Sequence, residues 1–228
     1  MSIKIMSLSR IILVFLVCSM VWVLFMTPQA SASSYDAIYY DFDEPFDWNV
    51  VSGTWGVANG SLEGFSNAEG LTYTSDIIWE DCILTAKVKI AAGSPRAEAT
   101  FCVRFADSGN FYWAGLGCWG HRVSISKMVD HVPEELIFSG DRADVVKDFW
   151  YNMSIRISSD EIMLYVNDVL ELTVNDSTFT SGVVGVRAWN SHMLVDYVSV
   201  STPELEIYRG FSCSGADFIY GKYTSEHF

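Results

Sequence analysis

Hydrophobic and polar residues alternate along most of the chain between Tyr35 and Val200, and almost no helical period is present. Such alternation predicts half-buried β-strands. One run alternates Cys82, Leu84, Ala86, Val88 and Ile90 with Ile83, Thr85, Lys87 and Lys89. A second run alternates Phe101, Val103 and Phe105 with Cys102, Arg104 and Ala106. Gly93-Ser94-Pro95 lies between the two runs and predicts a turn there.

Further strands are predicted at a spacing of about ten residues, over 153–157, 162–166 and 170–174, and turn sequences such as Asn167-Asp168 separate them. Many short antiparallel strands in an aromatic-rich chain predict two sheets packed face to face. We therefore expect an all-β, two-sheet antiparallel β-sandwich over residues 35–202. A C-terminal tail, 203–228, shows no clean alternation.

The closing run, 180–200, predicts two strands. Val184, Val186 and Ala188 alternate with Gly185, Arg187 and Trp189, so Arg187 and Trp189 are expected on an outward face. Asp196 lies among apolar residues, and a carboxylate in such surroundings needs backbone donors, an arginine or a metal ion as its partner.

Residues 111–119 predict a binding surface. If Tyr112, Ala114, Leu116 and Cys118 point inward, the opposite face carries Phe111, Trp113, Gly115, Gly117 and Trp119. Sugar rings stack on such aromatic platforms because their C–H faces are apolar. The candidate carbohydrate-binding residues are Arg104, Trp113, Trp119, Arg187 and Trp189. The alternative is that these aromatic side chains belong to the core or lie beneath the C-terminal tail.

The N-terminus has the order of a secretory signal peptide. Lys4 and Arg10 precede an apolar run, and Ala30-Ser31-Ala32 follows it, so we expect residues 1–32 to be removed. An uncleaved membrane anchor is the alternative. Either way the protein is expected to be secreted or at the cell surface. The segment holds two basic residues and no acidic one, so the remaining chain is more acidic than the net charge of −14 of the whole sequence. Such a charge disfavours nucleic acid and anionic lipid as partners.

Four cysteines follow the signal peptide: Cys82, Cys102, Cys118 and Cys213. Outside the cell this number permits up to two disulfides, in three connectivities that the sequence does not rank. Buried free thiols are the alternative. None of the spacings has the Cys-x-x-Cys form of a zinc site.

From Asp41 to Val200 the order of motifs resembles the concanavalin A-like lectin/glucanase superfamily, whose members are jelly rolls. The segment DFDEPFDWNVVSGTWGVANGSLEG, with Trp48, Trp55, Asn59 and Gly60, resembles the opening of its 3-keto-disaccharide hydrolase-like and laminin-G-like branches. FWYNMSIRISSDEIMLYVNDVLELTVND resembles their paired central strands, and SGVVGVRAWNSHMLVDYVSV their closing strands.

MLVDYVSV also resembles the final strand of glycoside hydrolase family 16, in which the aspartate belongs to a structural calcium site. That resemblance implies calcium at Asp196, with further oxygen ligands from backbone carbonyls near the N-terminal strand or from Asp41 and Asp43. The family's catalytic cluster, Glu-x-Asp-x-x-Glu on one strand, is missing from this sequence, and so are Gly-x-Ser-x-Gly and His-Glu-x-x-His motifs.

The sequence therefore favours an exported, non-catalytic module that binds a glycan or polysaccharide on a concave aromatic face. One alternative is a glycoside hydrolase of the 3-keto-disaccharide hydrolase-like type, which would use an acid such as Asp107, Asp130 or Glu135. The other is a structural or adhesive cell-envelope protein.

Overall fold

The computed structural model describes residues 37–43, 47–74 and 77–203. These residues form an all-β unit with two short 3₁₀ helices, η1 (Cys118–Gly120) and η2 (Arg142–Asp144). The first strands are β1 (Ala37–Tyr40), β2 (Asn49–Ser52), β3 (Thr54–Ala58), β4 (Ser61–Phe65), β5 (Glu69–Tyr73), β6 (Cys82–Asp107) and β7 (Asn110–Leu116). The remaining strands are β8 (His121–Val129), β9 (Val132–Asp141), β10 (Tyr151–Ser158), β11 (Glu161–Val166), β12 (Val169–Asn175) and β13 (Val183–Ser201). The predicted all-β class is confirmed.

The predicted signal peptide and all but the first residue of the predicted tail lie outside the described residues. Among the residues that are described, no helix is long and apolar enough to cross a membrane.

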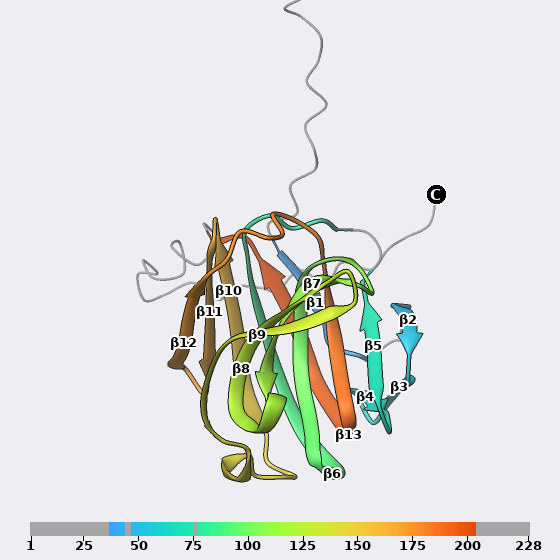
Figure 1. Cartoon of the computed structure of the whole chain (residues 1–228). Coiled ribbons are helices and arrows are strands. Elements are labelled where there is room, and N and C mark those ends of the chain that lie inside the picture. The colour runs from blue at the N-terminus through green and yellow to red at the C-terminus, as the bar shows by residue number, and fades with distance from the viewer. Residues whose placement is uncertain (1–36, 44–46, 75–76, 204–228) are drawn as a thin grey trace, which may run out of the picture. The chain divides into compact units, whose positions relative to one another are not determined.

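The long strands β6 and β13 organise the fold. They pair antiparallel along nearly their whole length, from Ile83 opposite Ser201 to Phe105 opposite Val183. The first half of β6 has β10 as its other neighbour, and the second half has β7. Likewise β13 pairs with β5 in its first half and with β4 and β1 in its second half. One continuous sheet is thus divided into two layers (Figure 1).

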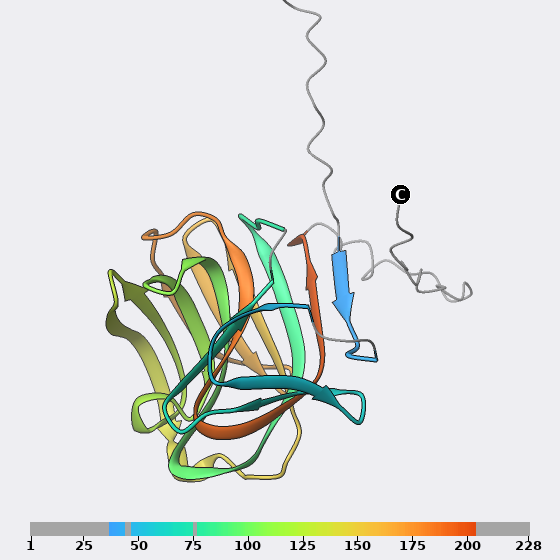
Figure 2. The ribbon, with the colours of Figure 1, turned by 90° about the vertical axis from the view of Figure 1, so that its right-hand side faces the viewer.

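The first layer contains β12, β11, β10, the first half of β6, the second half of β13, and then β4 and β3. Figure 2 shows β1 beside the end of β13 in this layer. The second layer contains β9, β8, β7, the second half of β6, the first half of β13, and then β5 and β2. The predicted two-sheet sandwich is confirmed, in a form in which the two sheets share their central strands.

The turn predicted at Gly93-Ser94-Pro95 is wrong. Residues 82–107 form one strand that bends without reversing direction, because both of its halves stay in antiparallel register with β13. Gly93 has φ +146° at this bend, and a Cβ atom there would lie 2.6 Å from the Asn190 carbonyl oxygen. Glycine is required because the two strands approach so closely.

The core lies between the layers and follows the predicted alternation. Leu84, Val88 and Ile155 of the first layer belong to one buried cluster with Phe101, Tyr112 and Val186 of the second. Each large apolar side chain contributes roughly 1.5–3 kcal/mol when it is fully buried. This cluster holds the two layers face to face.

A second buried cluster lies on the opposite side of the second layer. It contains Leu71, Cys102, Phe105, Phe111, Trp113, Cys118 and Met128. Cys102 alternates with the core residues Phe101 and Val103, and Trp113 alternates with Tyr112 and Ala114, so these side chains point away from the shared core. We call this side of the second layer its outer face.

Candidate functional site

Arg187 lies at the centre of the outer face. Its guanidinium carbon is 5.0 Å from the centre of the Trp113 ring and 5.3 Å from that of Trp189. Nε donates a hydrogen bond of 2.8 Å to Glu69, and Nη1 donates one of 2.8 Å to Glu98. Burial by itself lowers the pKa of Arg187, but the two carboxylates outweigh it and raise the pKa above its usual range. The arginine is therefore a charged cross-link between β5, β6 and β13.

Trp119 extends the outer face from the η1 turn. Its backbone has φ 54° and ψ 6°, a left-handed conformation that is unusual for a bulky residue. Its indole nitrogen donates a hydrogen bond of 3.1 Å to Ser126 Oγ, and Ser126 lies opposite Trp113 in the sheet. This bond holds the indole beside the Trp113 strand, although 48% of the residue stays exposed.

Polar side chains from β8 and β9 continue this face. The hydroxyl groups of Ser124 and Ser126 are 3.4 Å apart, and both serines are buried. Glu135 pairs with Ser126 across the sheet, and its Oε2 is 3.6 Å from His121 Nε2. His121 in turn stacks on Phe138, which is 53% exposed. The face thus combines exposed ring surface with hydroxyl and carboxylate groups.

The structure brings four of the five candidate binding residues together: Trp113, Trp119, Arg187 and Trp189. Their surroundings differ from the expectation. Trp113 was expected to form an open platform, but it is 1% exposed and lies beneath Arg187 in the second cluster. Arg187 was expected to offer donors to a ligand, but two of its nitrogens are bound to carboxylates. Of the candidate residues, Trp119 and the half-buried Trp189 are the ones whose rings reach the surface.

Arg104 does not belong to this group. It has φ +48°, and the register of β6 against β7 shifts between Val103 and Asp107. Its guanidinium donates hydrogen bonds to the carbonyl oxygens of Glu80, Ser159 and Phe179, at 2.9, 2.8 and 2.7 Å, and it is 2% exposed. Arg104 is therefore a structural residue that ties loops together, and its assignment to the binding rim is corrected.

Two further residues lie on the side opposite to the one that alternation predicted. The bulge at Arg104 places Phe105 in the outer cluster instead of the shared core. Cys118 also joins the outer cluster, because Gly117 at φ +81° starts the η1 turn and ends the regular pleat.

Sequence reasoning missed the acidic partners of this face. Glu69 and Glu98 flank Arg187, and Glu98 also lies 3.6 Å from Nη2 of Arg142. Glu98 and Cys102 are separated by an even number of positions. Extending the alternation of the predicted strand 101–105 backward would therefore have placed Glu98 on the same outward face as Cys102. No local signal pointed to Arg142, which reaches Glu98 from the distant η2 turn.

The aspartate predicted to bind calcium has a different partner in the structure. Asp196 Oδ2 lies 2.9 Å from Lys87 Nζ, on a neighbouring strand. Asp41 Oδ1 accepts a hydrogen bond of 3.3 Å from the Asp43 backbone. Across residues 37–43, 47–74 and 77–203, no three acidic, histidine or cysteine side chains form a group that could hold a metal ion. Calcium at Asp196, Asp41 and Asp43 stays a prediction.

The cysteines among the described residues are free thiols. Cys82, Cys102 and Cys118 are buried and none is bonded to another. Burial raises the pKa of Cys82 and Cys118 to about 12. Cys213 lies outside the described residues.

A scan against protein-family models finds no match, and a search of curated proteins finds none. Solved structures do share the architecture. The carbohydrate-binding module CBM66 from Bacillus subtilis matches 68% of this chain and 95% of its own, with a TM-score of 0.63 and 20% identity. The fold is a concanavalin A-like jelly roll.

Two glucanases have the same jelly roll. The Bacillus licheniformis β-glucanase aligns with 74% of this chain and 99% of its own, at a TM-score of 0.55 and 12% identity. A β-1,3-1,4-glucanase from a mouse hindgut metagenome covers 73% and 99%, with a TM-score of 0.57 and 12% identity. At these identities the likeness establishes the jelly roll and leaves the ligand to be argued from the site.

Proposed function

We propose that this protein is an exported, non-catalytic carbohydrate-binding module, and that it binds a glycan or polysaccharide on the outer face of its second layer. Trp119 and Trp189 provide the ring surfaces on which a sugar would stack. Glu69, which is partly exposed, and His121 border them and offer hydrogen-bonding groups to sugar hydroxyls.

One observation carries this proposal: the chain keeps a half-exposed tryptophan in a left-handed backbone conformation. Such a conformation costs on the order of 1–3 kcal/mol for a residue other than glycine. The hydrogen bond to Ser126 and partial burial offset some of this cost, but 48% of the residue stays exposed, so packing does not explain why an indole stands here. A ligand that stacks on the ring does explain it.

Two further observations support the proposal. The fold is shared with CBM66, which is itself a carbohydrate-binding module. The catalytic Glu-x-Asp-x-x-Glu pattern of family 16 is missing from the sequence. Export rests on the signal-peptide order of residues 1–32.

The experiment compares three variants by glycan array and by affinity electrophoresis in β-1,3-1,4-glucan. Trp119→Asn removes the indole but suits the left-handed backbone, because asparagine tolerates positive φ. We expect glycan binding at least about tenfold weaker, with the free energy of unfolding lowered by no more than about 0.5 kcal/mol. Trp189→Ala should weaken binding similarly.

The matched control is Trp150→Ala. Trp150 lies between Lys87 and Lys89 of the first layer, away from the outer face. Its loss should leave glycan affinity unchanged. Equal binding by the wild type and the Trp119 and Trp189 variants would refute the proposed surface. A wild-type protein that binds no glycan would favour the structural or adhesive alternative.

Glu135 supports the hydrolase as a second candidate function. Burial raises the pKa of Glu135, the nearby His121 partly opposes this, and Oε1 is buried without a hydrogen-bond partner. Glu98 on the same face is ion-paired with Arg187. A carboxylic acid with a raised pKa close to a carboxylate in an ion pair is the arrangement that acid–base chemistry requires.

Turnover tests this second candidate. Purified protein would be incubated with a 3-keto-glycoside and with β-1,3-1,4-glucan, and reducing ends would be measured. Activity that is lost in Glu135→Gln but kept in Glu134→Gln, its exposed neighbour, would establish the hydrolase. Absence of turnover by protein that binds glycan would exclude it for these substrates.

A further inference from the structure

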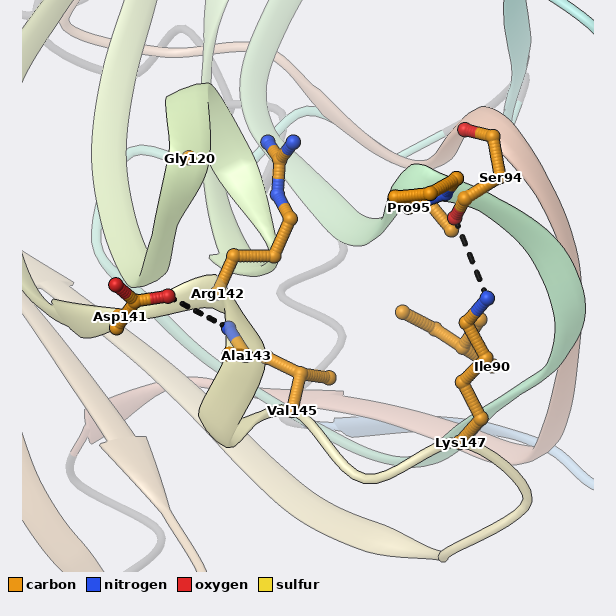
Figure 3. A pocket seen from close by; sticks show the side chains of 10 residues that line it. Ile90, Ser94, Pro95, Gly120, Asp141, Arg142, Ala143, Val145 and Lys147 are labelled. Atoms are coloured by element: carbon orange, nitrogen blue, oxygen red, sulfur yellow. Dashed lines mark hydrogen bonds between the residues drawn. The ribbon is translucent and has the colours of Figure 1, made fainter.

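A cavity of about 440 Å³ lies where β6 bends, next to the η1 end of the outer face. Its walls come from the bend itself, from the turn at Gly120 and from residues 141–147 (Figure 3). Ile90, Pro95 and Val145 give it an apolar lining, and Ser94, Arg142 and Lys147 give it a polar one. The volume is within the range of about 300–1,000 Å³ that is typical of small-molecule sites.

Lys147 places a positive charge at the wall of the cavity. Its Nζ donates hydrogen bonds to the carbonyl oxygens of Gly93 and Ser94, at 2.7 and 3.3 Å. These carbonyls orient the ammonium group without neutralising it. Among the described residues it has no acidic partner within 4.0 Å, whereas the neighbouring Asp148 is paired with Lys89.

Arg142 adds a second cation on the other side. Nε donates to the Gly117 carbonyl, and Nη2 forms an ion pair of 3.6 Å with Glu98, which balances part of its charge. Figure 3 shows its side chain extending between Gly120 and Pro95. Asp141, the acidic residue of the lining, accepts a hydrogen bond of 2.8 Å from the Ala143 backbone and caps the η2 turn.

We propose that this cavity binds one uronic acid residue. The sugar carboxylate pairs with Lys147, Arg142 borders it from the opposite wall, and an apolar ring face rests on Ile90, Pro95 and Val145. A protein of net charge −14 repels anions over most of its surface. Here Lys147 and Arg142 outnumber Asp141, the one carboxylate of the lining, so the cavity favours an anionic ligand. This site adjoins the proposed glycan face at Gly120, but it takes a different class of ligand.

The test is isothermal titration calorimetry with D-glucuronate, with D-glucose and acetate as comparison ligands. Glucuronate should bind at least tenfold more tightly than glucose, which lacks the carboxylate, and than acetate, which lacks the ring. Raising the salt concentration from 0.1 to 0.5 M should weaken glucuronate binding.

Two variants separate the parts of the site. Lys147→Met should weaken glucuronate binding at least tenfold, while the matched control Lys89→Met, which removes a lysine paired outside the cavity, should not change it. Ala143→Trp places an indole at the exposed lining position 143 and should abolish binding. Thermal unfolding of each variant verifies that it is folded.

Equal affinities for glucuronate and glucose, or wild-type affinity in Lys147→Met or in Ala143→Trp, would overturn the proposal. Its failure is distinguishable from failure of the glycan face. Trp119→Asn should keep glucuronate binding, and Lys147→Met should keep β-1,3-1,4-glucan binding.

Discussion

The ion-pair network around Arg187 should dominate the stability of the second layer. In Arg187→Met the side chain keeps its apolar stem between Trp113 and Trp189 but loses its charge. Glu98, whose side chain is 11% exposed, is then left with only the distant Nη2 of Arg142 at 3.6 Å. Glu69 is 32% exposed and regains water, so its loss contributes little.

Removing one partner of a buried ion pair costs about 3–5 kcal/mol, because the other charge stays buried. We therefore expect Arg187→Met to lower the free energy of unfolding by about this amount. For a domain of this size the melting temperature should fall by roughly 6–20 °C. Adding Glu98→Gln to Arg187→Met removes the uncompensated charge and should restore at least about 1 kcal/mol.

Urea unfolding followed by tryptophan fluorescence measures the free energies of unfolding of the single and the double variant. The matched control is Lys87→Met, which breaks the Lys87–Asp196 pair, whose side chains are 36% and 39% exposed. It should cost at most about 1 kcal/mol. A loss below 1 kcal/mol in Arg187→Met, or a second substitution that destabilises further, would show that this network is not what stabilises the face.

Three other predictions concern pH, metal and thiols. Burial alone raises the pKa of Asp176, but hydrogen bonds from Lys127 and its neighbours outweigh it and hold the pKa below its usual value. The stabilisation is therefore present above about pH 4 and lost as the pH falls further. The free energy of unfolding of Asp176→Asn, measured in urea, should therefore decrease less below pH 4 than that of the wild type. Calcium should raise the melting temperature of the wild type over that in EDTA, and Asp196→Asn should remove this rise; equal values with and without calcium would contradict the calcium prediction. Cys82 and Cys118 should resist iodoacetamide at pH 8 until urea unfolds the protein, as peptide mapping by mass spectrometry would show.

Much of the fold could be predicted because alternation is a local property. Val184, Val186 and Ala188 lie in the shared core as their pattern indicated. The same two-residue period placed Trp113, Arg187 and Trp189 on one side of one layer, since neighbouring strands of a sheet share their faces.

The period fails where the backbone departs from a regular pleat. Arg104 and Trp119 both have positive φ, and neither is a glycine. No residue type indicated the bulge, and Gly117 is the one local sign of the η1 turn. One extra residue in a strand reverses the faces of all that follow, which is why Phe105 changed sides.

The sequence alone determined which side chains alternate, and therefore the strands, the sandwich and the aromatic character of one face. Only the tertiary structure decided which of those aromatic side chains are open to a ligand. Glu98 is 89 residues from Arg187 and Glu69 is 118 residues from it, yet both bind its guanidinium. Contacts at such separations depend on how the long strands bend and pair. That pairing buries Trp113, engages Arg187 and leaves Trp119 at the surface.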